Sequence, residues 1–552
     1  MARYAAFRRQ PVDPQVAAQL RAVTLPAPTR GIIQNENEAY MQPGGCLVCD
    51  NWAPTLRGVK LRGGCIRHCV LPETTPIISG FEYVSGNNQR MYAANAHKLY
   101  DVTAATPVLV KDSYNSGNYA AAQYTNAGGD WILVANDAGD PVLRSKDGVV
   151  WYPLDASGTP PATAPDGSSW ITGPAGSAVQ YGHNLSYVWK YRNHLFFIER
   201  SSMNAWYLDI DAVGGLLKLI PLSGSASGGG HLLFGAVWSL DAGDGADDKC
   251  VFVTDLGEVL VFTGSNPSDA ANWRQEGRYA ISPPLGMNAH INVGGDLLIL
   301  TVDGIIPISQ AVDKSAGQLE LAMLTRTIKP MWRAEVAAKR AWAWSAEKWD
   351  DFGAIFVTTP GGIPGKRYCL LANNATGAWA RFPGWDATCF MRLRSEMFFG
   401  TQGGVVMQAN VGGKDDGALY TATLVGGWET FGTPASQIVW HQARAVFRAS
   451  GAQPFAPQLS ATVDYAIKIP PAPSAGPDPG PGEGWDEGTW DVAHWDADSD
   501  AEPPIRNTLW VSIGKTGFAH APIIQVTVAQ QRTPDVELIA LTATYEPAGV
   551  NV

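Results

Sequence analysis

The sequence predicts an all-β protein whose central part is a β-propeller of about seven blades. Gly (59 residues), Pro (38) and Trp (20) are frequent, whereas charged residues make up only 16%. Gly and Pro favour turns, and aromatic side chains favour strands. In addition, a hairpin-like pattern recurs along residues 46–414 at intervals of roughly 40 to 60 residues, the repeat length of propeller blades.

The recurring pattern has the features of a β-hairpin. In VFVTDLGEVLVFTG, which starts at Val251, two apolar runs flank a Gly-containing turn. Similar copies begin at Met91, Ile132, Leu195, Leu297, Ile355 and Met397. The interval leaves room for a second hairpin in each repeat, which would complete a four-stranded blade. A β-sandwich or a β-solenoid could use the same hairpins, but the interval is too long and irregular for a tight solenoid.

Three parts can be distinguished along the chain. Residues 1–45 are rich in Pro with little periodicity, which predicts an extended N-terminal arm. Residues 46–414 form the predicted propeller. Residues 415–552 alternate like strands and predict a C-terminal β-rich domain resembling a small sandwich, with a Pro/Gly linker near 470–484.

One stretch of the predicted propeller departs from the hairpin pattern. Residues 315–344 are rich in Ala, Leu, Glu, Lys and Arg, which are good helix formers. Pro330 lacks a backbone N–H and predicts a break in the helix. We therefore expect a short helical insertion that packs against the propeller rim or a partner.

The charge balance excludes one class of function. A net charge of -11 argues against a protein that grips nucleic acid, because such affinity comes from clustered Lys and Arg. An acidic surface is compatible with DNA that slides past without binding. No apolar run approaches the roughly 18 to 20 residues of a membrane span, and the N-terminus lacks a secretory signal pattern. We expect folding in a cytoplasm, without membrane insertion.

Four cysteines have the one metal-like spacing in the sequence. Cys46-x-x-Cys49 is followed by Cys65-x-x-x-Cys69, with His68 beside the second pair. Four thiolates could hold zinc if the two pairs met across a hairpin. Both pairs can equally lie in strands, where buried free thiols act as small core residues. The preferred interpretation is that no metal and no cofactor is bound, with zinc as the alternative.

A turn near residue 147 is close to a known propeller motif. Ser145 to Trp151 reads SKDGVVW and resembles the Asp-box of sialidase-type propellers, Ser-x-Asp-x-Gly-x-Thr-Trp. Here Asp147 and Gly148 are adjacent, so one residue is missing, and Val150 stands at the Thr position. In those enzymes the box braces a hairpin turn and is not catalytic. A glycosidase needs paired carboxylates or an activated Tyr, so a propeller glycosidase is the less favoured alternative, and we predict no enzyme.

A second turn-like pattern lies near the C-terminus. Trp485, Trp490 and Trp495 are followed by Asp486, Asp491 and Asp496, respectively. A sugar- or calcium-binding loop is one interpretation. The five-residue spacing fits neither an EF-hand nor a helix face, which favours an extended segment whose indoles cover an apolar surface. No Walker loop, nucleophile elbow or HExxH motif occurs, and the isolated His290 is expected to be structural.

Several short motifs follow one another in a particular order. They are PAPTRG from Pro26, MQPGG from Met41, NWAPTLRGV from Asn51, LRGG from Leu61, FTGSNPSDAANW from Phe262, ISPPLG from Ile281, GGDLLILTVDG from Gly294, TGAW from Thr376 and GWD from Gly384. This order resembles the tail and tail-accessory proteins of short-tailed phages and prophages, whose opening reads Pro-x-x-Gly, a Met-Pro turn, Asn-Trp-Phe-Pro-Thr and Arg-x-Gly. The resemblance covers most of residues 26–500, and the four cysteines are not part of it.

The resemblance implies a tail nozzle protein of the kind called tail tubular protein B. Such proteins are propeller-containing subunits of a sixfold ring below the tail adaptor, and the ring lines the channel through which the genome leaves. The implied partners are further copies of the chain, the adaptor, and tail fibres or spikes, with DNA passing without specific binding. The implied location is the virion tail, assembled in the host cytoplasm. A host-surface or glycan-binding tail protein is the alternative.

Overall fold

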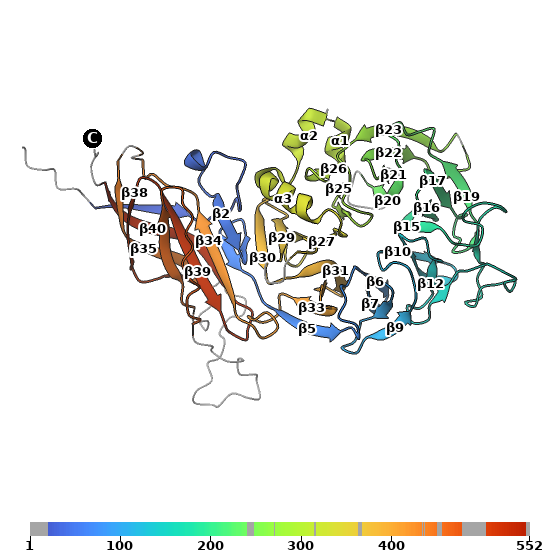
Figure 1. Cartoon of the computed structure of the whole chain (residues 1–552), viewed down its shortest axis with the longest axis horizontal. Helices are drawn as coiled ribbons and strands as arrows, with labels where there is room; N and C mark the ends of the chain where they lie inside the picture. The colour runs from blue at the N-terminus through green and yellow to red at the C-terminus, as the bar shows by residue number, and fades with distance from the viewer. Residues whose placement is uncertain are drawn as a thin grey trace, which may run out of the picture.

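The computed structural model in Figure 1 is an all-β protein that contains a β-propeller. It describes residues 20–239, 248–269, 271–313, 316–362, 367–432, 434, 436–449, 455–476 and 504–547. Strands account for 48% of the chain and helices for 6%. The propeller lies on the right of the view, and a second unit of long strands lies on the left.

The propeller has six antiparallel four-stranded blades, and in the first five the strands lie side by side in chain order. Blade 1 has β6 (Ser79–Ser85), β7 (Asn88–Ala94), β8 (Leu99–Asp101) and β9 (Val108–Lys111); blade 2 has β10 (Tyr119–Asn126), β11 (Gly129–Asn136), β12 (Leu143–Ser145) and β13 (Tyr152–Pro153). Blade 3 has β15 (Leu185–Tyr191), β16 (His194–Glu199), β17 (Asn204–Tyr207) and β19 (Lys218–Pro221); blade 4 has β20 (Leu232–Trp238), β21 (Lys249–Thr254), β22 (Glu258–Thr263) and β23 (Arg274–Ala280). A short parallel pair, β14 (Ile171–Thr172) and β18 (Gly215–Leu216), lies outside these blades.

Blades 5 and 6 both pair with strands of the N-terminal segment. Blade 5 has β27 (Ala346–Trp349), β28 (Ala354–Val357), β29 (Tyr368–Asn373) and β30 (Trp379–Pro383), and its sheet continues into the second unit. Blade 6 has β31 (Ala387–Leu393), β32 (Glu396–Thr401), β33 (Val405–Ala409) and β5 (Cys65–Val70). Because β5 precedes every blade in sequence yet forms the outer strand of the last one, it closes the ring.

The expected number of about seven blades is corrected to six four-stranded blades. The hairpin copy beginning at Leu297 belongs to a three-stranded sheet, β24 (His290–Val293), β25 (Asp296–Leu300) and β26 (Ile305–Pro307). This smaller sheet follows blade 4 in the chain. It gains no fourth strand because the chain enters a helix directly after Pro307.

Helices follow this smaller sheet. They are α1 (Ile308–Asp313), α2 (Ala316–Ala322), the 3-10 turn η2 (Arg326–Ile328) and α3 (Lys329–Lys339); a further 3-10 turn, η1 (Glu38–Tyr40), lies near the N-terminus. Pro330 was predicted to break a helix, but it lies in the first turn of α3, where no intrahelical N–H bond is lost. Buried Trp332 anchors α3 by donating from Nε1 to the carbonyl of Thr301 at 3.0 Å. None of the helices in the described ranges has the length and apolarity that a membrane crossing requires.

The second unit consists of two antiparallel arrays built from both ends of the chain. One sheet contains β1 (Arg21–Pro26), β3 (Trp52–Pro54), β4 (Val59–Leu61), β40 (Val536–Pro547), β35 (Ile438–Ala449), β37 (Ile505–Asn507) and β38 (Val511–Gly517). The other contains β2 (Cys46–Asp50), β34 (Tyr420–Gly426), β39 (His520–Val528) and β36 (Gln458–Val463), and β2 joins β30 of blade 5. Residues 46–61 therefore belong to this unit and not to a blade, and part of the expected arm is strand β1 paired with β40.

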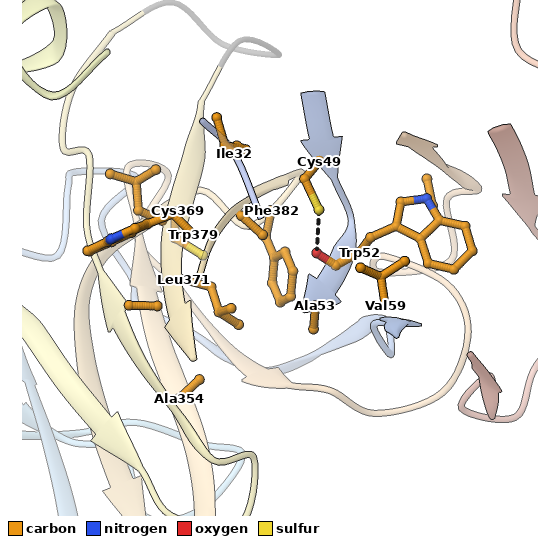
Figure 2. Packing of buried hydrophobic residues seen from close by; sticks show 14 of the residues in the cluster. Ile32, Cys49, Trp52, Ala53, Val59, Ala354, Cys369, Leu371, Trp379 and Phe382 are labelled. Carbon is orange, nitrogen blue, oxygen red and sulfur yellow. Dashed lines mark hydrogen bonds between the residues drawn. The ribbon is translucent and has the colours of Figure 1, made fainter. Parts of the chain in front are cut away.

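The two units share one apolar core, part of which is shown in Figure 2. Ile32 and Trp52 from the N-terminal segment belong to the same buried cluster as Trp379 and Phe382 of β30. The cluster continues to Trp440 of β35 in the second unit. Since these side chains are almost fully buried, separating the units would expose a large apolar surface to water.

A buried arginine lies at the centre of this joint. The Arg62 guanidinium donates to both carboxylate oxygens of Asp415 at 2.8 and 2.6 Å, to Asn51 Oδ1 at 2.7 Å and to the Pro383 carbonyl at 3.0 Å. Its planar group also lies 4.0 Å from the centre of the Tyr420 ring. The side chain is fully buried, so these contacts replace the water that it loses.

A second bidentate pair lies where the sheet of blade 5 passes into the second unit. Arg381 of β30 donates to the two carboxylate oxygens of Asp50 in β2 at 2.7 and 2.8 Å. The pair flanks the backbone contact between the same two strands. Apolar burial and two ion pairs thus hold the propeller and the second unit as one body.

We expect Arg62→Leu to lower the free energy of unfolding by about 3 to 5 kcal/mol, because Asp415 would stay buried without its partner. Arg67→Leu is the matched control. Arg67 pairs with Asp416, the residue after Asp415, but more than half of the Arg67 side chain is exposed. The control should lose less than about 1 kcal/mol. Urea unfolding followed by tryptophan fluorescence measures both changes. Equal losses in the two variants would contradict a special role for the buried pair.

Candidate functional site

A cavity in the described structure lies where the first strands of several blades approach one another. Its volume is about 330 Å³, and its walls come from β6, β10, β15, β27 and β31, with His290 of β24. The first strand of a propeller blade lies nearest the central axis. The cavity is therefore axial, and its chemistry is set by residues that are far apart in the sequence.

Three charged side chains meet in the wall of this axial cavity. They are Glu82 from β6, Glu347 from β27 and Arg392 from β31. Arg392 Nε lies 3.1 Å from Glu347 Oε1, and Arg392 Nη2 lies 3.5 Å from Glu82 Oε1. The side chains are 31%, 28% and 37% exposed, respectively, so a ligand could reach each of them. One guanidinium thus bridges carboxylates from two other blades.

The two carboxylates are incompletely compensated by this arginine. Burial raises the pKa of Glu347 to about 7; Arg392 opposes the change, whereas the charges of Glu82 and Asp350 reinforce it. Burial also raises the pKa of Glu82, again against the influence of Arg392. At neutral pH, Glu347 is therefore divided between its protonated and its ionised form.

His290 forms another part of the cavity wall. Its ring stacks on Phe234 with a centroid distance of 4.4 Å and an interplanar angle of 4°. Its Nε2 lies 3.2 Å from the hydroxyl of Tyr187. Burial lowers the pKa of His290 to about 4, so the imidazole is neutral at physiological pH. These contacts agree with the predicted structural role and leave the ring uncharged beside the cavity.

The four cysteines do not form a metal site. Cys46 and Cys49 lie on β2 in the second unit, and Cys65 and Cys69 lie on β5 in blade 6. Cys49 Sγ donates to the Trp52 carbonyl at 3.3 Å, as Figure 2 shows.

These thiols are buried in their strands. Burial raises the pKa of Cys49 and Cys65, and it raises that of Cys69 to about 11, which fits thiols packed as small core residues. Over the described ranges, no group of three or more His, Cys, Asp and Glu side chains could hold a metal ion. The zinc alternative has no support in this arrangement.

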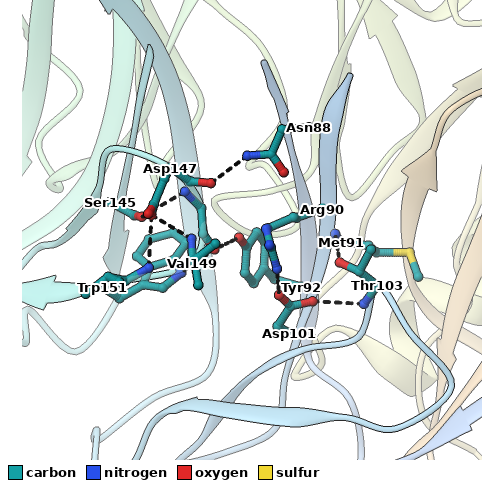
Figure 3. Close-up of polar contacts among 12 residues, drawn as sticks. Asn88, Arg90, Met91, Tyr92, Asp101, Thr103, Ser145, Asp147, Val149 and Trp151 are labelled. Carbon is teal, nitrogen blue, oxygen red and sulfur yellow. Dashed lines mark hydrogen bonds and ion pairs between the residues drawn. The ribbon is translucent and has the colours of Figure 1, made fainter. Parts of the chain in front are cut away.

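The Asp-box-like turn joins β12 to β13 and is drawn in Figure 3. Asp147 Oδ1 accepts hydrogen bonds from the backbone N–H groups of Val149 and Val150 at 2.8 and 3.0 Å. Tyr92 of β7 donates its hydroxyl to the Gly148 carbonyl, so the turn also fastens blade 2 to blade 1. The residues serve as a brace between blades, as predicted for an ordinary blade turn, and they do not line the axial cavity.

Sequence reasoning missed the three charged residues of the cavity. Glu82, Glu347 and Arg392 come from three blades, and no local spacing connects them. The signal that could have found them is their position on the first strand of a predicted blade. The Trp–Asp repeat at residues 485–496 lies outside the described residues.

Comparison with known proteins gives distant similarities to solved propellers. No protein-family model matches the chain, and no curated protein matches it in sequence. Many solved structures are similar to it, among them the following three. YCF48 from Cyanidioschyzon merolae is 12% identical with a TM-score of 0.35 and covers 62% of this chain and 98% of its own. The β-propeller domain of Cps50 (Swd1) from Myceliophteria thermophila is 10% identical with a TM-score of 0.38, and the match covers 64% of this chain and 99% of that domain. The computationally designed Ika8 protein is 10% identical with a TM-score of 0.34, and the match covers 63% of this chain and 100% of the designed protein.

We expect the Glu347→Gln variant to lose part of the pH dependence of stability. Because the folded protein keeps the Glu347 proton up to about pH 7 while the unfolded chain releases it near pH 4.5, this group makes folding less favourable as pH rises between those values. The free energy of unfolding should fall by roughly 2 to 3 kcal/mol less in the variant than in the wild type over this window. Urea unfolding at pH 5 and pH 7.5 measures the difference.

Glu396→Gln is the control for this experiment, because Glu396 is an exposed carboxylate at the start of β32. Its pH dependence should match that of the wild type. If the free energy of unfolding of Glu347→Gln had the same pH dependence as that of the wild type, Glu347 would not retain its proton in the folded protein at neutral pH.

Proposed function

We propose that the protein is a structural virion protein, a subunit of an oligomeric ring that forms the nozzle of a phage tail below the adaptor. In this proposal the second unit is a sandwich-like contact module and the propeller is a rigid body. The ring would consist of six copies, and the genome would pass through its channel. The net charge of -11 supports a channel with little affinity for DNA.

The observation that carries the proposal is the position of the phage-like opening motifs in the joint between the two units. Asn51, Trp52 and Arg62, which belong to these motifs, all lie in the joint between the two units. Gly58 of the same segment lies against β40, where a Cβ would come within 2.1 Å of the Leu538 carbonyl oxygen. The residues that resemble tail proteins thus build a rigid connection, which is what a ring subunit under load requires.

The edges of the second unit support self-association. Strands β1 and β38 lie at opposite edges of one sheet, with β40 and β35 between them, and every neighbouring pair is antiparallel. Consequently β1 and β38 run in opposite directions. A second copy placed head to tail could add its β1 beside β38 and continue the antiparallel sheet. Head-to-tail contacts of this kind close into rings.

Exposed apolar side chains lie at the β38 edge. Ile505, Leu509 and Trp510 are 61%, 87% and 41% exposed, respectively, and they lie in or between the edge strands β37 and β38. Apolar side chains on an exposed edge favour pairing with another chain. We therefore place the contact between copies at this edge.

The axial cavity gives less support to the enzymatic alternative. A glycosidase uses two carboxylates that act on opposite sides of one glycosidic bond. Here Glu82 and Glu347 both contact the same guanidinium, that of Arg392. This arrangement ties three blades together and does not leave an evident acid and nucleophile facing each other.

The proposal predicts a ring. Electron microscopy and mass photometry of the purified protein, alone and mixed with the tail adaptor, should detect a closed ring of about six times the 59.0 kDa chain mass. Mass spectrometry of purified phage particles should detect the chain in the tail. A protein that stays monomeric with the adaptor and is absent from particles would overturn the proposal.

A charge at the proposed edge should block assembly without unfolding the chain. We expect Leu509→Lys to shift the population from ring to monomer by at least about tenfold, because a buried lysine would have no partner in the contact. Ile210→Lys is the matched control, since Ile210 is 62% exposed but lies in the propeller. Thermal melting should be the same for both variants. If both variants assembled like the wild type, the contact would lie elsewhere.

A further inference from the structure

The axial cavity has a charge that its own residues leave unbalanced. Of the described residues in its wall, Glu82, Glu347 and Arg392 carry a formal charge, giving one excess negative charge when both carboxylates are ionised. Asp350 adds to the negative potential at Glu347, although its own carboxylate is paired with Lys348 at 2.6 Å, and the His290 ring is neutral. A positively charged group entering the cavity would meet two carboxylates that share a single guanidinium.

The size and the lining of the cavity favour an organic cation over a metal ion. A volume of about 330 Å³ is at the lower end of the range for small-molecule sites and far exceeds a bare ion. The wall also contains the aromatic residues Phe81, Tyr187 and Phe390. Aromatic rings attract ammonium and guanidinium groups through their faces. Aromatic and carboxylate residues in one small cavity are a combination suited to such groups.

We propose that the axial cavity is a binding site for a small organic cation, with an ammonium or guanidinium group held by Glu82 and Glu347 and its alkyl body against the aromatic wall. Arg392 keeps the two carboxylates together at distances of 3.5 and 3.1 Å, so the site exists before the ligand enters. A pre-formed site loses little conformational freedom on binding. This function is separate from ring formation, because it uses the first strands of the blades and not the edges of the second unit.

Binding of a cation would be coupled to a proton. The ligand favours the ionised form of Glu347, whose proton is retained up to about pH 7 in the free protein. Binding near neutral pH would therefore release part of a proton. Because the ionised fraction of a group with this pKa rises from about one tenth at pH 6 to about nine tenths at pH 8, the affinity should tighten by up to about tenfold over that interval.

Isothermal titration calorimetry of the full chain tests the proposal with three probes of similar size. We expect 1,4-diaminobutane and butylguanidinium to bind and 1,4-butanediol, the uncharged control, not to bind. At pH 7, the observed enthalpy for the cations should depend on the ionisation enthalpy of the buffer, which reports the released proton. This readout uses the wild-type protein and does not depend on any variant folding correctly.

Glu347→Gln and Glu82→Gln should each weaken cation binding by at least about tenfold, equivalent to about 1.4 kcal/mol. Glu347→Gln should also abolish the buffer dependence. Glu396→Gln, outside the cavity, should bind like the wild type. Equal binding of butanediol, unchanged affinity in Glu347→Gln, or no binding of either cation at about 10 mM would overturn the proposal.

Discussion

The buried guanidinium of Arg62 is the contact on which the arrangement of the two units depends. Its ion pair with Asp415 and its bond to Asn51 connect a segment near residue 60 to one near residue 415, where the chain leaves the last blade. An arginine without a carboxylate partner would be strongly unfavourable at this depth. Because the pair is satisfied only when both segments are in place, it couples closure of the ring to the packing of the second unit.

The path of the N-terminal segment connects the two units. After β1 and β2 the chain forms β3 and β4 in the second unit and then supplies β5 to the last blade. Strand β5 therefore completes the last blade, and the chain that leads into it comes directly from β4 in the second unit. In addition, β2 of the second unit pairs with β30 of blade 5, so loss of either unit would leave one of these strands without its partner. The shared cluster around Trp52 and Trp379 is the apolar counterpart of this connection.

Local patterns were sufficient to predict the blades but not the pairing of distant strands. The hairpin from Val251 is a real part of blade 4, because its turn and alternation are encoded within fourteen neighbouring residues. Nothing in the sequence near Cys65 says that β5 pairs with β33. The spacing of Cys46 to Cys69 left zinc open as an alternative, whereas the two cysteine pairs lie in separate strands, β2 and β5. Likewise Glu82, Glu347 and Arg392 become neighbours only through ring closure, so no motif could have revealed the cavity.

Stability alone would favour apolar side chains over the charged side chains that line the cavity. An interior clamp between blades could be made from apolar side chains, which avoid the loss of hydration that ionised groups suffer. Here Arg392 is shared between two carboxylates, and burial keeps a proton on Glu347 at a pH where an ordinary glutamate has lost it. A fold selected for rigidity alone has no need of this arrangement. All three side chains are partly exposed to a cavity of about 330 Å³. A cation that enters this cavity would neutralise the excess negative charge of the two carboxylates.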